Sequence, residues 1–273
     1  MNLRKNSRGC IMDRLIIGVN LFKPNIRQEL CIQSLVKLQQ QYPFIDLVNL
    51  QFASGEDLYE DPRIPTKQCL TKMSKDIVGD KTMPIVKEFF DSLSDMGYPA
   101  FCFTNNDIII SNRLIELFLN SDYDCYPVSR LAIEPIESLD DKIVGSHYQA
   151  VGFDTYIIKT NWWKDHYNMF RDYIAGQPQW DVAFATIMKL YGNTLLVNDW
   201  PPKIFHIIHE APWTTTAKDT PENKWNLSLF NGVDKKYADI WWRYVYNVPL
   251  KRGYNYWYPL PNERELEDKY FNL

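Results

Sequence analysis

The sequence has no close cysteine pairs, no clusters of basic residues and no long apolar runs. Its five cysteines, Cys10, Cys31, Cys69, Cys102 and Cys125, are widely spaced and form no CxxC pair, which argues against a zinc knuckle. Lysine and arginine are scattered and the formal net charge is −4. That charge argues against a broad nucleic-acid-binding face, although it leaves room for a local basic groove. No apolar run is long enough to cross a bilayer.

The N-terminal residues are basic but lack the apolar stretch that a secretory signal requires. We therefore expect residues 1–13 to be a flexible arm, or to precede a true start at Met12. Unpaired cysteines suit a reducing compartment, so the expected location is the cytoplasm. At 273 residues, the chain is long enough for one large domain or two small ones.

Segments with strand-like and helix-like periodicity alternate along most of the chain. The branched apolar run at 14–20 predicts a buried strand, an apolar stripe behind Asn25 predicts a helix over 24–43, and the run at 44–52 predicts a second strand. Strand, helix and strand at this spacing form a βαβ unit. Beyond it we expect irregular structure at 54–80, strands at 98–105, 125–133 and 151–160, extended segments at 193–199 and 203–210, and helices at 83–97, 111–121, 161–176 and 179–192.

This alternation predicts an α/β fold: an αβα sandwich with a mostly parallel sheet over residues 14–210. The composition changes after that point, because residues 211–273 contain five of the nine tryptophans. We expect these residues to be an aromatic-rich extension that packs on the core.

The segment FCFTNNDIIIS, residues 101–111, breaks an apolar strand with four polar residues, Thr104 to Asp107. Asparagine and aspartate favour turns and helix caps, which is one interpretation. The other is a ligand site, because ligands of open α/β sheets bind beyond the carboxyl ends of the strands. Asn20 follows another predicted strand. Carboxylate and amide oxygens suit Mg²⁺ or Mn²⁺ shared with a diphosphate.

Further acidic and imidazole side chains are candidates for the same site. Asp181 lies near a predicted helix start, where the helix dipole alone would favour a carboxylate. Asp154 lies beside a glycine at a strand entry. In an extended segment, His206 and His209 would point to opposite faces, whereas on a helix they would share one.

Three basic residues are weaker candidates for contacts with a ligand at this site. Arg130 interrupts an apolar strand, so its guanidinium needs an anionic partner, either a structural carboxylate or a ligand. Lys72 and Lys81 lie in the irregular segment and either reach a diphosphate or remain solvated.

The order of these features resembles that of GT-A glycosyltransferases. FTNNDI resembles the TNSDI-type form of the DxD turn, and GQPQWDVAFATIMKLYGNTLLVND…HIIH is similar to the GxPxWDNW…A…HxxH pattern of nucleotide-diphospho-sugar transferase-like proteins. The resemblance covers roughly residues 14–210. The sequence departs from the family pattern at Asn105, which stands at the first acidic position of the turn and leaves Asp107 as the acidic residue.

The resemblance implies a metal-dependent glycosyltransferase that uses a UDP- or GDP-linked sugar. Asp107 and His206 would hold Mn²⁺ or Mg²⁺, and Asp181 would be the catalytic base. The sugar nucleotide would contact Asn20, Lys72, Lys81, Asn105, Asn106, Arg130 and Asp154. The acceptor, a glycan or a nucleic acid, would meet Trp180, His209 and Trp213.

Two alternatives stay open. One is a glycosyltransferase that acts on modified DNA bases. The other is a sugar-nucleotide-binding module that has lost catalysis, which the departure at Asn105 would explain.

Overall fold

The computed structural model describes residues 14–22, 25–198, 201–209, 219–231 and 257–259. The predicted N-terminal arm, Trp213 and most of the aromatic-rich extension lie outside the described residues. In the described part of the chain no helix is both long and apolar enough to cross a membrane.

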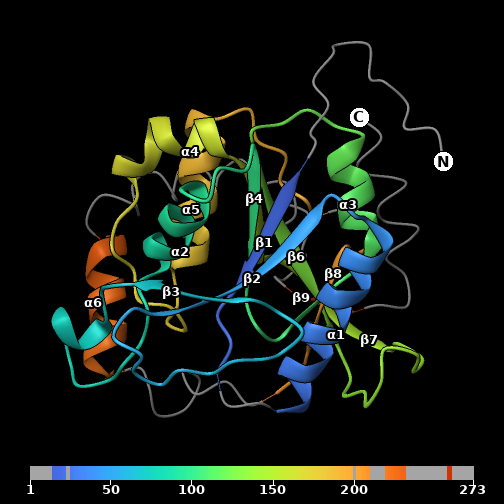
Figure 1. The fold of residues 1–273 in the computed structure, drawn as a ribbon, viewed down its shortest axis with the longest axis horizontal. Coiled ribbons are helices and arrows are strands. Elements are labelled where there is room, and N and C mark those ends of the chain that lie inside the picture. The colour runs from blue at the N-terminus through green and yellow to red at the C-terminus, as the bar shows by residue number, and fades with distance from the viewer. Residues whose placement is uncertain (1–13, 23–24, 199–200, 210–218, 232–256, 260–273) are drawn as a thin grey trace.

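The described strands form one mixed sheet (Figure 1). Its order is β3-β2-β1-β4-β7-β6-β8-β5, with β9 paired to β7. The strands are β1 (Leu15–Val19), β2 (Ile45–Phe52), β3 (Thr66–Leu70), β4 (Ala100–Thr104), β5 (Ile108–Ile110), β6 (Cys125–Ile133), β7 (Gly145–Lys159), β8 (Ile204–Ile207) and β9 (Trp257–Pro259).

We expected a mostly parallel sheet, and consecutive parallel strands form one half of the observed sheet. The strands β3, β2, β1 and β4 are parallel neighbours, which brings their carboxyl ends to one edge. The strand β7 runs antiparallel to its neighbours β4, β6 and β9. The polar turn of residues 105–107 follows β4, at the place where the parallel half meets β7.

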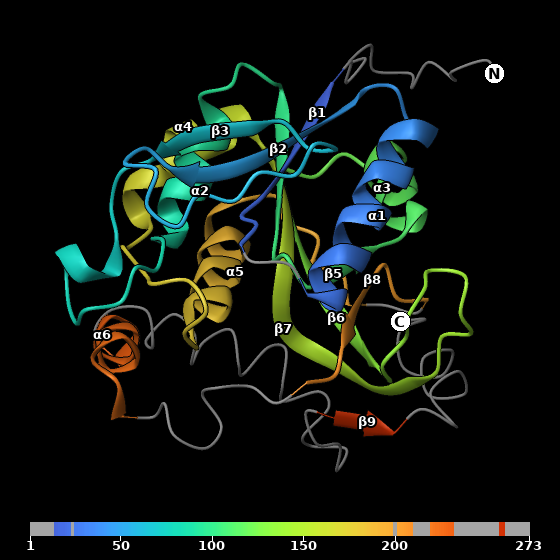
Figure 2. The same cartoon turned by 60° about the horizontal axis from the view of Figure 1, so that its bottom comes forward.

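Helices cover both faces of the sheet (Figure 2). The helices are α1 (Ile26–Gln41), α2 (Val86–Ser94), α3 (Asn112–Leu119), α4 (Thr160–His166), α5 (Trp180–Tyr191) and α6 (Pro221–Leu229). On β1, Ile16 packs into the core of the α2–α4–α5 face, while Leu15 and Ile17 pack into the core of the α1–α3 face. Alternate side chains of a strand point to opposite faces, so this pattern gives a three-layer α/β sandwich.

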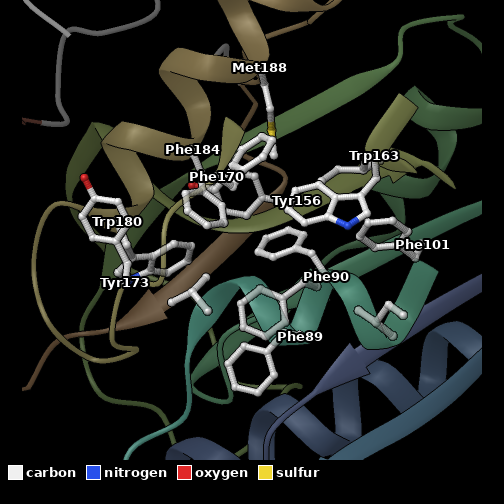
Figure 3. Close-up of a cluster of buried hydrophobic side chains, with 14 of the residues drawn as sticks. Phe89, Phe90, Phe101, Tyr156, Trp163, Phe170, Tyr173, Trp180, Phe184 and Met188 are labelled. Carbon is white, nitrogen blue, oxygen red and sulfur yellow. The ribbon is translucent and has the colours of Figure 1, made fainter. Parts of the chain in front are cut away.

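Aromatic rings fill the core on the α2–α4–α5 face (Figure 3). Phe90 of α2 is at the centre, with ring centroids of neighbouring aromatic residues 5.1–6.0 Å away. Those neighbours are Phe101, Phe103, Tyr156, Trp163 and Phe184. Much of the high aromatic content of the sequence therefore serves packing in this layer.

Several predicted elements are confirmed. The βαβ unit is formed by β1, α1 and β2, and Asn25 caps α1 by accepting hydrogen bonds from the backbone N–H groups of Arg27 and Gln28. The predicted strand at 125–133 is β6, and the helix predicted over 179–192 is α5.

Other predictions about elements were wrong. The helix expected over 161–176 ends at His166, and a 3₁₀ turn at Tyr167–Met169 leads into a loop. The irregular segment 54–80 contains the strand β3, and Ile108–Ile110, for which no element was predicted, forms the strand β5. Pro84 precedes α2, which begins at Val86, instead of lying in its first turn.

Candidate functional site

Asp107 and two histidines form the centre of the candidate site. Asp107 lies at the end of the turn after β4, directly before β5. His206 lies on β8, which pairs antiparallel with β5 so that Ile108 faces His206. The Oδ2 atom of Asp107 is 3.2 Å from Nε2 of His206 and 3.3 Å from Nε2 of His209.

Both histidines reach the same carboxylate, although an extended chain would have separated them. The strand β8 ends at Ile207, so residues 208 and 209 do not continue its alternation. The rings of His206 and His209 lie 5.0 Å apart between centroids. His209 therefore lies in the Asp107 cluster, and its expected role on the acceptor side stays a prediction.

The donor atoms of this cluster fit a divalent cation. One ligand atom each from Asp107, His206 and His209 lies within 4.8 Å of the others. Ligand atoms that share one ion through bonds of about 2.0–2.2 Å lie roughly 3 Å apart or more, which agrees with the two N–O distances. Two imidazoles with one carboxylate suit Mn²⁺ or another transition metal better than Mg²⁺, which prefers oxygen ligands.

Asp107 is held in its ionised form. Desolvation opposes ionisation, but the hydrogen bonds from His206 and His209 outweigh it and hold the pKa of Asp107 well below its ordinary value. The positive charge of Arg130 acts in the same direction. The carboxylate therefore requires no deprotonation before it binds a cation.

Asp154 explains the departure at Asn105. The Nδ2 group of Asn105 donates to Oδ1 of Asp154 at 2.7 Å, and the backbone N–H of Asn105 donates to the Asp154 carbonyl at 2.9 Å. The Arg130 guanidinium donates to Oδ2 of the same carboxylate. A carboxylate at position 105 would face a second carboxylate, so the amide is the group that fits. Arg130 thus has a structural carboxylate as its partner.

Amide side chains connect the loop after β1 with the turn. The Asn106 side chain donates to the Asn20 carbonyl at 2.8 Å, and the Asn20 side chain donates to the Leu50 carbonyl at 2.6 Å. Gln28 of α1 accepts from the Phe22 N–H and donates to the Phe22 carbonyl. Asn20 and Asn106 therefore bond to the protein backbone in this structure.

Sequence reasoning missed Gln28 and two further amides, Asn49 and Gln51 of β2. All three are buried and bond to the segments that follow β1 and β2. Their signal was present in the sequence. Gln28 lies on the same helical stripe as Cys31 and Leu35, and an amide inside a buried stripe needs a hydrogen-bond partner.

Asp181 lies in the first turn of α5 and is partly exposed. Desolvation by the surrounding protein raises the pKa of its carboxyl to about 6, and the negative charge of Asp154 acts in the same direction. The backbone N–H groups of Val182 and Phe153 and the charge of Arg130 oppose this shift. Arg130 therefore lies close enough to influence the carboxylates of both Asp107 and Asp181.

Lys72, Lys81 and Trp180 contact partners outside the Asp107 cluster. Lys72 forms an ion pair with Asp172 at 3.0 Å, and the Nζ atom of Lys81 lies 3.7 Å from Glu222. Trp180 is buried in the aromatic core, where its ring contacts Tyr156 and Phe184 among others. Its role toward an acceptor stays a prediction, as does that of Trp213, which lies outside the described residues.

No protein-family model and no curated protein matches the chain. Similar solved structures include S. aureus TarS 1–349, with 12% identity and a TM-score of 0.43. The glycosyltransferase GlyE of Streptococcus pneumoniae TIGR4 has 14% sequence identity and a TM-score of 0.39. The galactosyltransferase LgtC, in complex with donor and acceptor sugar analogs, has 10% identity and a TM-score of 0.34. In that order, the matches extend over 71%, 85% and 81% of this chain and over 60%, 64% and 95% of the length of the matched chains. Likeness at this level says nothing about donor, acceptor or metal.

Proposed function

We propose that the protein is a metal-dependent glycosyltransferase that moves a sugar from a nucleoside diphosphate to an acceptor hydroxyl. The observation that carries the proposal is the cluster of Asp107, His206 and His209 at the sheet edge, together with Asp181, whose carboxyl is influenced by the same Arg130 charge as Asp107. The order of sequence features that resembles GT-A glycosyltransferases supports the same class. UDP and GDP sugars are the expected donors.

The three residues of the cluster would hold a divalent cation, and Mn²⁺ fits the donor set better than Mg²⁺. A cation bound there would supply positive charge to the departing nucleoside diphosphate. We propose His209 as a ligand of this cation, together with Asp107 and His206.

Asp181 is the proposed base for a transfer that inverts the anomeric configuration. The acceptor oxygen forms a bond to the anomeric carbon, the bond from that carbon to the diphosphate breaks, and the acceptor proton moves to the Asp181 carboxylate. A base works best when its pKa lies near the working pH. With a pKa of about 6, Asp181 is mostly ionised at neutral pH and ready to take the proton.

The amide at position 105 does not by itself indicate lost catalysis, because its hydrogen bond to Asp154 gives it a structural reason. For the same reason, Arg130 and Asp154 are proposed to shape the site by holding the turn and balancing charge. Because a guanidinium carries five N–H donors, the bond to Asp154 does not by itself prevent a contact of Arg130 with the diphosphate.

The test is a turnover assay with the full chain and a panel of UDP and GDP sugars, with Mn²⁺, Mg²⁺ or EDTA. We expect release of nucleoside diphosphate with at least one donor, and loss of release in EDTA. The variants Asp107→Asn and His206→Ala should lose the activity, and Asp181→Asn should lower transfer by roughly 10²–10⁴-fold while donor still binds.

Glu116→Gln, at an exposed position of α3, is the matched control and should keep wild-type turnover. Donor binding without any turnover would favour the non-catalytic module. Transfer to hydroxylated DNA, with an affinity that falls steeply with salt, would favour the alternative acceptor.

A further inference from the structure

The loop of residues 171–179 leads directly into Asp181. It follows the 3₁₀ turn after α4 and ends where α5 begins (Figure 2). On one side it is held by the start of α2 and the segment before it: the Val86 N–H donates to the Tyr173 carbonyl at 2.8 Å, and the Ala175 N–H donates to the Pro84 carbonyl at 2.9 Å. These bonds fix the middle of the loop but leave its last residues to other contacts.

Asn226 of α6 holds the loop from the other side. Its Oδ1 atom accepts from the Ile174 N–H at 2.8 Å, and its Nδ2 group donates to the carbonyls of Ile174 at 3.0 Å and Pro178 at 3.2 Å. The side chain is completely buried. A buried amide that makes three bonds to one loop fixes two separate points of that loop.

The second of these points precedes a residue with unusual backbone geometry. Gln179 has a φ of 84°, in the left-handed region that side-chain-bearing residues rarely adopt, and it is the N-cap residue of α5. Gln179 makes no side-chain capping bond, so the helix start lacks that support. A conformation of this kind persists only where the surroundings hold it.

Asp181 lies two residues beyond Gln179 and depends on the position of this helix start. Its backbone carbonyl accepts a hydrogen bond from the Tyr156 hydroxyl at 2.8 Å, which ties the first turn of α5 to β7. The charged groups that act on its carboxyl are Asp154 of β7 and Arg130 of β6. A shift of the helix start changes the distance from the Asp181 carboxylate to each of them.

We propose that Asn226 is a positioning residue for Asp181: by fixing the Pro178 carbonyl it holds the strained Gln179 and so sets where α5 begins. This inference rests on the proposed role of Asp181 as the base. It assigns α6, which lies between β8 and β9 in sequence, a part in the geometry of the site. The opposing explanation is that Asn226 only docks α6 onto the loop.

The test compares Asn226→Ala with Trp225→Phe in the full chain. The Trp225 Nε1 group donates to the Asp172 carbonyl at 2.9 Å, so the control removes one bond between the same helix and the same loop, six residues before Pro178 in the sequence. The first readout is the pKa of Asp181, measured by carbon NMR of aspartate carboxyl groups and assigned with Asp181→Asn. Thermal unfolding reports stability in parallel.

We expect Asn226→Ala to lower the pKa of Asp181 by half a unit or more, because a loosened helix start admits water to the carboxyl. Transfer should fall about 10- to 100-fold with donor KM changed less than about threefold, since a displaced base slows the chemical step. Trp225→Phe should lower the unfolding temperature but leave the pKa in place. Equal pKa values in both variants and wild type would overturn the proposal.

Asn226→Asp serves if the alanine variant does not fold. It keeps the acceptor for the Ile174 N–H and, when ionised, loses both donors, so it should shift the same pKa. The NMR readout requires no transfer activity. If the wild-type protein shows no transfer activity but the pKa of Asp181 still changes in the Asn226 variants, the proposed reaction is wrong and the positioning role of Asn226 stands.

Discussion

Asn105 shows how a single residue can depart from a family pattern for a local reason. Its amide faces the Asp154 carboxylate, whose other oxygen is bound by Arg130. We predict that Asn105→Asp does not strengthen Mn²⁺ binding and lowers stability, because two carboxylates in contact cannot both ionise easily. Calorimetric titration with Mn²⁺ and thermal unfolding at pH 5 and pH 8 measure both effects.

The double variant Asn105→Asp/Asp154→Asn is the matched control, since it exchanges the two groups and restores one amide beside one carboxylate. It should recover part of the stability lost in the single variant. Tighter Mn²⁺ binding by Asn105→Asp without loss of stability would show that position 105 is a free ligand position.

Asp181 is predicted to cost stability at neutral pH. Its pKa of about 6 lies above the ordinary value of 3.8, so the folded state binds the proton more tightly than the unfolded state. Stability therefore falls as pH rises between those two values, by about 1–3 kcal/mol in all, and stays lower above pH 6. Asp181→Asn should raise the unfolding free energy at pH 7.5 and raise it much less at pH 4.

Chemical denaturation at the two pH values checks this prediction. The same substitution should lower transfer by roughly 10²–10⁴-fold, so activity and stability should change in opposite directions. An Asp181→Asn variant that is equally destabilised at both pH values would indicate that the carboxyl is an ordinary capping group.

At the scale of elements, α2 joins the sheet to α4 and α5 through Phe90. The ring is fully buried and contacts aromatic side chains from β4, β7, α4 and α5. We predict that Phe90→Ala lowers the free energy of unfolding by about 3–5 kcal/mol, because no neighbouring element can close the cavity alone. Phe22→Ala, at a side chain that is 51% exposed, should cost no more than about 0.5 kcal/mol.

Denaturant titration with an unchanged m-value would confirm the difference. A small effect of Phe90→Ala would mean that the aromatic layer rearranges around the missing ring.

The elements that the sequence predicted well are those with apolar periodicity of their own, such as α1 with its Asn25 cap and the strand β6. The strand β3 was missed because most of its residues are exposed or partly exposed, so it has no apolar alternation to detect. The helix expected over 161–176 was too long because its second half bonds to Pro84, Val86 and Asn226, partners that periodicity cannot identify.

The candidate site was partly predictable for the same reason. Asp107 and Asp181 stand at a strand end and a helix start, positions that local patterns reveal. That His206 and His209 would meet one carboxylate was not predictable, because it depends on β5 pairing with β8 about a hundred residues further along the chain, and on the end of β8 at Ile207.

For the whole molecule, the parallel strands β1, β2, β3 and β4 bring their carboxyl ends to one edge of the sheet, and β8 brings the two histidines to Asp107 at that edge. The central claim is that this edge binds a nucleoside diphosphate through a divalent cation. In that case neither ligand alone should stabilise the fold as the pair does, because each supplies the binding surface of the other.

Thermal unfolding of the full chain with UDP and GDP, each with Mn²⁺ or with EDTA, tests this claim most directly. At a nucleotide concentration about 100-fold above the dissociation constant, we expect about 2.7 kcal/mol of stabilisation for one of the nucleotides in Mn²⁺. We expect almost none in EDTA and none for Asp107→Asn in either condition. Equal stabilisation with and without Mn²⁺, or full stabilisation of Asp107→Asn, would show that the nucleotide does not bind through a cation held by Asp107.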